Sequence, residues 1–189
     1  MCTGIILAGG KSRRMNGVDK GLIPFNGKPM IEHVISALKP VVDEVIIIAN
    51  SRGYEPFGLP IYPDIVQEKG PLGGLLSGLT QSKSDDVIIV GCDMPFVENT
   101  IFTTLQKYKH KYDIVIPKTP DGIQPLCGLY KKKCIPVIHQ LIEENQLKMT
   151  HLFNQMNTYF LPFKNKTPFF NMNSPEDIKS GYKLKEIDL

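Results

Sequence analysis

The sequence lacks the marks of several protein classes. Its 22 Lys and Arg nearly balance its 19 Asp and Glu, and the net charge of +3 over 189 residues is too small for a protein that coats nucleic acid. No apolar stretch approaches the roughly 20 residues of a membrane helix. The N-terminus has neither the basic start nor the apolar length of a signal peptide. We therefore expect no nucleic-acid partner, no membrane and a cytoplasmic protein.

Cysteine is scarce and scattered. The four cysteines form no CxxC pair and have no His at the spacing of a zinc site, so we expect reduced, mostly buried thiols and no zinc; they are Cys2, Cys92, Cys127 and Cys134. What is present is ordinary for a globular protein, with 42% hydrophobic and 22% charged residues. This composition predicts one domain over residues 1–189 with a sizeable core.

Short β-branched runs alternate with longer stretches of helical period. Strands are expected at 4–7, 45–49, 87–90 and 114–116, and helices at 30–38, 72–79, 99–108 and 132–144, with a last helix after Ser174. Pro29 is the expected first residue of one helix and Asn99 the expected cap of another. The alternation predicts an α/β fold with three layers, α/β/α, around a mostly parallel sheet.

Ligands of such sheets bind beyond the carboxyl ends of the strands, and the segment after the first strand has phosphate-binding chemistry. Gly9 and Gly10 let the backbone approach a ligand closely and aim N–H groups at anionic oxygens. Four cations follow within ten residues, Lys11, Arg13, Arg14 and Lys20. The spacing is neither a Walker A motif nor GxGxxG. A solvated basic loop has the same composition, so both interpretations stay open at this point.

Three polar residues at other predicted strand ends allow two interpretations each. Asp93 follows an apolar run, where a divalent cation bridging triphosphate oxygens needs an oxygen ligand, but it also suits a turn before Pro95. Asp64 could accept hydrogen bonds from a guanine ring or simply form a turn. Asn50 could contact a ligand or form an Asx-turn.

Six short motifs, in order along nearly the whole chain, resemble those of the molybdenum cofactor guanylyltransferases, the MobA family of nucleotidyltransferases. They are Leu7 to Met15 with Asp19-Lys20, Gly27-Lys28-Pro29, Ala49-Asn50, Asp64 with Gly70-Pro71-Leu72, Cys92-Asp93-Met94-Pro95, and Asn171 to Glu176. The segment from Gln124 to Tyr130 resembles a part of the family thought to face the second substrate, although a strand beside a proline turn explains it equally well.

The resemblance implies a Rossmann-like nucleotidyltransferase fold and the transfer of GMP from GTP to the terminal phosphate of molybdenum-molybdopterin. It implies Mg²⁺ as cofactor, held by Asp93, and transient contact with proteins that deliver or accept the product. Arg14, Lys20 and Asp93 would be catalytic, the two cations by offsetting charge on the pyrophosphate leaving group. The nucleotide-binding residues would be Leu7, Ala8, Gly9, Gly10, Lys20, Asn50, Asp64 and Asp93.

Two other functions fit parts of the pattern. One is a related nucleotidyltransferase that uses CTP or a sugar phosphate, although Gly9-Gly10 matches the guanylyl pattern rather than the Leu-Ala-Ala-Gly of cytidylyl relatives. The other is a non-catalytic adaptor that binds the cofactor, which the presence of Gly9, Lys20 and Asp93 disfavours. The chain departs from the family at 145–149, where Lys148 alone remains of a commonly basic stretch.

Overall fold

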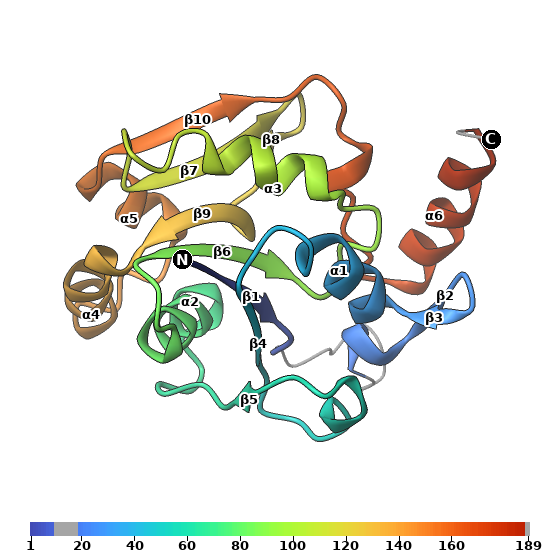
Figure 1. Ribbon diagram of the computed structural model, residues 1–189, viewed down its shortest axis with the longest axis horizontal. Coiled ribbons are helices and arrows are strands. Elements are labelled where there is room, and N and C mark those ends of the chain that lie inside the picture. The colour runs from blue at the N-terminus through green and yellow to red at the C-terminus, as the bar shows by residue number, and fades with distance from the viewer. Residues whose placement is uncertain (10–18, 188–189) are drawn as a thin grey trace.

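The computed structural model describes residues 1–9 and 19–187, and a mixed sheet forms its centre (Figure 1). Within the described range the sheet has eight strands in the order β10-β7-β9-β6-β1-β4-β5, with β8 paired to β7. The strands are β1 (Cys2–Leu7), β4 (Glu44–Ile48), β5 (Ile61–Tyr62), β6 (Asp86–Gly91), β7 (Ile114–Thr119), β8 (Gly122–Ile123), β9 (Cys127–Lys131) and β10 (Thr158–Pro162). A separate hairpin joins β2 (Pro24–Phe25) to β3 (Lys28–Pro29).

The helices are α1 (Met30–Leu38), α2 (Gly70–Gln81), α3 (Asn99–Gln106), α4 (Ile135–Glu143), α5 (Met149–Gln155) and α6 (Pro175–Ile187). Single turns of 3-10 helix are η2 (Lys20–Leu22), η3 (Glu55–Phe57), η4 (Lys132–Cys134) and η5 (Thr167–Phe169). In the part of the chain that the structure describes, no helix has the length and apolar character to cross a membrane.

The sheet is mostly parallel, as predicted. β1 pairs in parallel with β4 and with β6, β4 with β5, and β10 with β7. β9 is antiparallel to both β6 and β7, so β7 runs in the same direction as β6. Six strands therefore end at one edge of the sheet, which is where a ligand site is expected.

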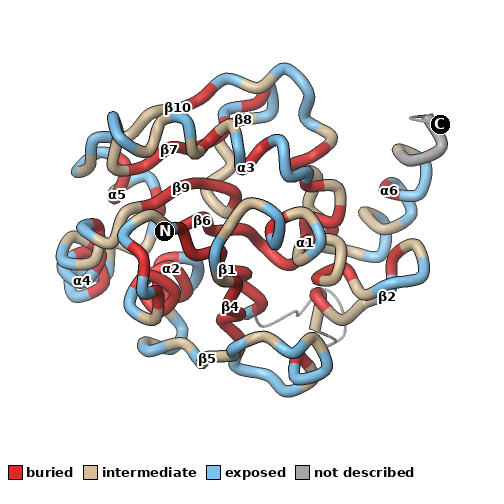
Figure 2. Tube along the Cα trace, viewed as in Figure 1, coloured by how far each residue is buried: buried red, intermediate tan, exposed pale blue. Residues whose placement is uncertain are grey.

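Each of the central strands buries both of its faces (Figure 2). In β1, Ile6 packs with α1 and α3, whereas Ile5 and Leu7 face α2. The same alternation runs through β4 and β6. This double burial explains why these strands show no polar alternation in sequence, and it confirms the three-layer α/β/α arrangement.

Three predicted helix starts are wrong in detail, and backbone hydrogen bonding explains one of them. Pro29 belongs to β3 and precedes α1, and Asn99 is the first residue of α3 rather than its cap, a position that Glu98 takes. The helix expected from Lys132 begins instead as η4, and α4 starts at Ile135. Pro136 has no N–H to donate to the Lys132 carbonyl, so a continuous α-helix cannot cover this stretch.

The glycines of α2 let this helix lie directly on the sheet. A Cβ at Gly78 would lie 2.7 Å from Cδ1 and 2.8 Å from Cγ2 of Ile5 on β1. We expect Gly78→Ala to lower the free energy of unfolding by about 1–2 kcal/mol, because overpacking costs about 1–3 kcal/mol and improved helix propensity returns only part of that. Urea denaturation measures the change.

The matched test is a double-mutant cycle with Ile5→Ala, which removes both atoms that the new methyl group would strike. The double variant should lose less stability than the two single variants together, since the added methyl then fills the space that the smaller side chain leaves. Strict additivity would show that the close approach of α2 to β1 is not what makes glycine necessary here.

Candidate active site

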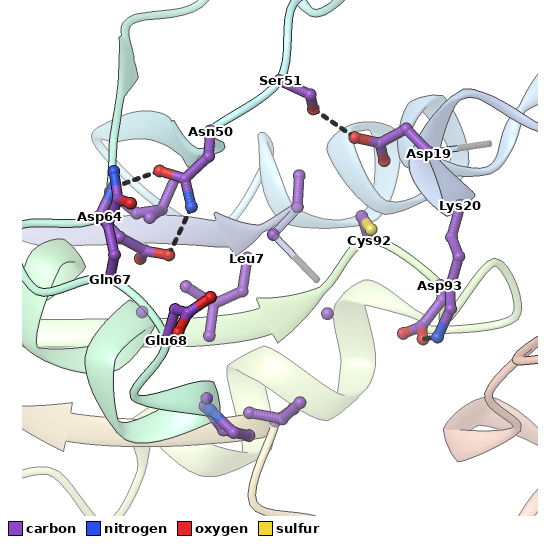
Figure 3. A pocket seen from close by; sticks show the side chains of 18 of the residues that line it. Leu7, Asp19, Lys20, Asn50, Ser51, Asp64, Gln67, Glu68, Cys92 and Asp93 are labelled. Carbon is purple, nitrogen blue, oxygen red and sulfur yellow. Dashed lines mark hydrogen bonds and ion pairs between the residues drawn. The ribbon is translucent and has the colours of Figure 1, made fainter. Parts of the chain in front are cut away.

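The loops that follow β1, β4 and β6 line one cleft of about 1070 Å³ (Figure 3). Backbone hydrogen bonds hold these strand ends together past the strands themselves. The Ala8 N–H donates to the Ile48 carbonyl at 2.8 Å, and the Cys92 N–H donates to the Leu7 carbonyl at 3.1 Å. The turn after the first strand and the acid after β6 therefore face a common space.

Seven of the sequence-predicted binding residues line this cleft, namely Leu7, Ala8, Gly9, Lys20, Asn50, Asp64 and Asp93. Gly10 and Arg14 lie outside the described residues, as do Lys11 and Arg13. The structure thus brings together predicted residues from the ends of β1, β4, β5 and β6 and the segments that follow them.

A lysine and a half-buried acid meet at one end of the cleft. Nζ of Lys20 lies 3.5 Å from Oδ2 of Asp93 and donates to Oδ1 of Asn173 at 2.5 Å. The two charged side chains are only 25% and 16% exposed. Burial raises the pKa of the Asp93 carboxyl above its ordinary value, and the charge and hydrogen bond of Lys20 oppose the shift. Both charges are therefore partly shielded from water, so the electrostatic interaction of the pair with a bound cation or anion is stronger than it would be in bulk water.

Two neighbouring backbone segments hold Asp93 in place. The Met172 N–H donates to its carbonyl at 2.9 Å, which ties the segment before α6 to the end of β6. A Cβ at Gly91 would lie 2.8 Å from Oδ1 of Asp93. Any larger residue at position 91 would therefore collide with the carboxylate.

An asparagine and an acid clamp each other at the opposite end of the cleft (Figure 3). Nδ2 of Asn50 donates to Oδ2 of Asp64 at 2.8 Å, and the Asp64 N–H donates to Oδ1 of Asn50 at 2.9 Å. The other carboxylate oxygen, Oδ1 of Asp64, is the single buried side-chain oxygen or nitrogen within the described residues that has no hydrogen-bond partner. Oδ1 of Asp64 is thus a hydrogen-bond acceptor for which the described residues supply no donor.

Sequence reasoning missed several residues of the cleft, including Asp19, Ser51, Cys92 and Asn173. Asp19 and Asn173 lie in motifs that were noted, so a signal for them existed. Ser51 had only its position after a strand to mark it. Asn173 owes its position to α6, where the Asn173 N–H and the Ser174 hydroxyl both donate to Oδ2 of Asp177 at 2.9 Å.

A smaller recess of about 210 Å³ adjoins the cleft beyond Asp93. It shares Asp93, Leu126 and Asn173 with the cleft, and Gln124 and Asn171 lie in its wall. The segment whose resemblance suggested the second substrate is thus next to the acid after β6, and β9 places it there by pairing antiparallel with β6.

Acidic residues do not gather into a metal site of their own. Among the residues that the structure describes, no three His, Cys, Asp or Glu side chains stand together so that they could hold a metal ion. Asp93 offers one carboxylate, which matches the way Mg²⁺ binds through one or two protein carboxylates together with phosphate oxygens of a substrate.

A glycine turn, a lysine and an acid at the carboxyl edge of a mostly parallel sheet define a nucleotide-binding α/β protein. The chain belongs to the MobA-like NTP transferase family, whose model matches residues 4–158.

The curated relatives and a solved structure that are similar to this chain carry related names. The probable molybdenum cofactor guanylyltransferase of Clostridium perfringens strain 13 is 36% identical over 191 residues, covering 96% of each chain. The molybdenum cofactor guanylyltransferase of Vibrio parahaemolyticus is 35% identical over 178 residues, covering 92% of this chain and 91% of that protein. The structure of molybdopterin-guanine dinucleotide biosynthesis protein A from Archaeoglobus fulgidus has a TM-score of 0.82 at 22% identity, covering 98% of this chain and 99% of that chain. This likeness confirms the nucleotidyltransferase fold.

The raised pKa of Asp93 gives a prediction about stability. The folded protein binds the carboxyl proton more tightly than the unfolded chain, so the ionised form lowers stability, and this cost is complete above the raised pKa. Asp93→Asn keeps the shape and removes the charge. We expect its Tm to equal or exceed that of the wild type at about pH 8, with the difference shrinking as the pH falls through the raised pKa and the wild-type carboxyl takes up its proton.

Asp86→Asn is the matched control for this thermal unfolding series. Asp86 lies at the other end of the same strand, is 17% exposed and pairs with Lys109 at 3.8 Å. A clear drop in the Tm of Asp93→Asn at about pH 8 would show that the Lys20 ion pair outweighs the burial of Asp93.

Proposed function

We propose that this chain transfers GMP from GTP to the terminal phosphate of molybdenum-molybdopterin, forming the guanine dinucleotide of the cofactor and releasing pyrophosphate. The observation that carries the proposal is the polarity of the cleft. A cation and an acid stand at one end, and at the other stands an acid with an oxygen that lacks a partner among the described residues. The curated relatives carry the name of this activity.

The end of the cleft at Lys20 would receive the triphosphate. Its ammonium group would offset the charge that develops on the pyrophosphate leaving group, and Arg14 and the Gly9-Gly10 amides are proposed to do the same. The acceptor phosphate is a nucleophile at neutral pH, so the reaction needs no general base. Catalysis then consists of holding two polyanions in line and reducing their repulsion.

Asp93 is the residue proposed to hold Mg²⁺, together with phosphate oxygens of the substrate. The fit rests on its single, partly buried carboxylate at the end of β6, next to the lysine. When bound, the ion would supply positive charge to the phosphates. Lys20 would orient the same carboxylate from the protein side, and Oδ1 of Asn173 would hold the ammonium group of Lys20.

The end of the cleft at Asp64 would receive the base. Guanine presents a ring N–H and an amino group on one edge, and a carboxylate can accept from both. The Asn50 clamp fixes Oδ2 of Asp64 and leaves Oδ1 without a donor from residues 1–9 and 19–187. Leu7, Ala8 and Gly9 would contact the nucleotide between the two ends. The recess by Gln124 is proposed to receive the pterin substrate, because it shares Asp93 with the cleft and so lies beside the proposed position of the reacting phosphates.

The test of the reaction is pyrophosphate release from GTP with metallated pterin as acceptor and Mg²⁺ present. We expect Asp93→Asn and Lys20→Ala each to lower turnover by about a hundredfold or more, as loss of a group that stabilises transition-state charge does. Asp86→Asn is again the matched control and should retain turnover. Near-normal turnover in Asp93→Asn would remove the metal assignment, and GTP binding without pyrophosphate release by the wild type would favour a non-catalytic adaptor.

The test of base recognition is a thermal-shift panel of GTP, CTP, ATP and UTP with Mg²⁺. We expect GTP to stabilise the protein most. Asp64→Asn replaces one acceptor oxygen by an N–H donor, so it should weaken GTP by about tenfold or more while leaving CTP within about twofold. Selective stabilisation of the wild type by CTP would instead support the cytidylyl alternative.

A further inference from the structure

Asp19 immediately precedes Lys20, and donors from three sources hold its carboxylate. The Tyr54 hydroxyl and the Gly21 N–H donate to Oδ1, the latter at 3.3 Å, and the Ser51 hydroxyl donates to Oδ2. Tyr54 and Ser51 belong to the segment after β4, so this segment anchors the residue before the lysine that is proposed to be catalytic. Figure 3 shows the bond from Ser51 across the mouth of the cleft.

Tyr54 is completely buried and touches the chain on both sides of Lys20. Its hydroxyl bonds to Asp19, and a Cβ built on Gly21 would lie 2.7 Å from the Tyr54 oxygen and 3.2 Å from Sγ of Cys92. The turn η2 therefore lies directly against Tyr54 and against the residue that precedes Asp93. The residues on both sides of Lys20, Asp19 and Gly21, thus lie against the hydroxyl of Tyr54.

A carboxylate in the wall of a cleft repels a polyanion that binds there, unless other groups of the protein compensate its charge. Asp19 lines the cleft, but protein donors occupy both of its oxygens. Its charge is thus compensated by hydrogen bonds from within the chain, and the carboxylate serves as an anchor for the backbone rather than as a ligand.

We propose that Tyr54 and Ser51 are positioning residues that act through Asp19 to hold Lys20 against Asp93. The inference rests on the proposed function, because it takes the Lys20 end of the cleft as the triphosphate site. Ser51 follows Asn50, which clamps Asp64. The segment 50–54 therefore bonds to Asp19 at the proposed phosphate end of the cleft and to Asp64 at the proposed base end. It thereby sets the distance between the two ends.

The experiment compares the affinities of GTP and of guanosine, with Mg²⁺, in the wild type and in Tyr54→Phe, which removes only the hydroxyl. We expect GTP to bind about fivefold to tenfold more weakly while guanosine changes by less than about twofold, since guanosine has no phosphate for Lys20 to contact. In a Lys20→Ala background, Tyr54→Phe should add no further loss of GTP affinity. Ser51→Ala, at an exposed position, should reproduce the GTP effect in weaker form.

Thr3→Val is the matched control for loss of a buried hydroxyl. Thr3 is fully buried in β1, away from the cleft, and its hydroxyl donates to Ser84 at 3.1 Å. It should leave both affinities unchanged even if its Tm falls as far as that of Tyr54→Phe. Equal weakening of GTP and guanosine, an unchanged GTP affinity in Tyr54→Phe, or an undiminished effect in the Lys20→Ala background would each overturn the proposal.

These binding measurements do not depend on turnover. A wild type that binds GTP through Lys20 but releases no pyrophosphate would end the proposed reaction and leave the positioning role standing. The reverse result, full turnover with no selective effect of Tyr54→Phe on GTP, would end the positioning role and leave the reaction standing.

Discussion

The apolar character of both faces of β1, β4 and β6 is the constraint on which the structure depends. Strands that must be covered on two sides need helices in two layers, and the helices exclude water from the whole length of the strands. Polar and charged groups are then confined to the segments beyond the strand ends. The site stands at the carboxyl edge because six strands end there, and the polar residues that follow β1, β4, β5 and β6 converge on one cleft.

The two ends of the cleft use the same kind of group in different ways. Asp93 is paired with a lysine, whose charge and hydrogen bond oppose the rise in the pKa of its carboxyl that burial causes. Asp64 has an asparagine for one oxygen, and none of the described residues donates to the other. A cation beside the first acid and an unpartnered acceptor on the second create opposite electrostatic preferences within one space, which suits a nucleotide with an anionic tail and a base that donates hydrogen bonds.

Distant parts of the chain contribute to the Lys20 end. The turn carrying Lys20 is held by residues after β4, and its ammonium group is oriented by Asn173, whose backbone is fixed by the first turn of α6. The segment before α6 also bonds to the backbone of Asp93. The C-terminal helix thus belongs to the same structural unit as the phosphate end, although most of the sequence separates them.

The sequence by itself determined the layers and the mostly parallel sheet, because hydrophobic periodicity and double burial are local properties of the chain. It also marked Lys20, Asn50, Asp64 and Asp93 through their motifs, and the family that these motifs resemble proved to be the family of the chain. Only the tertiary structure decided which atoms are paired. Residues far apart in the chain are joined by the bond from Tyr54 to Asp19, by the contact of Lys20 with Asn173 and by the bond from Asn50 to Asp64. Such contacts depend on how close the strands and turns come, and no local pattern encodes that distance.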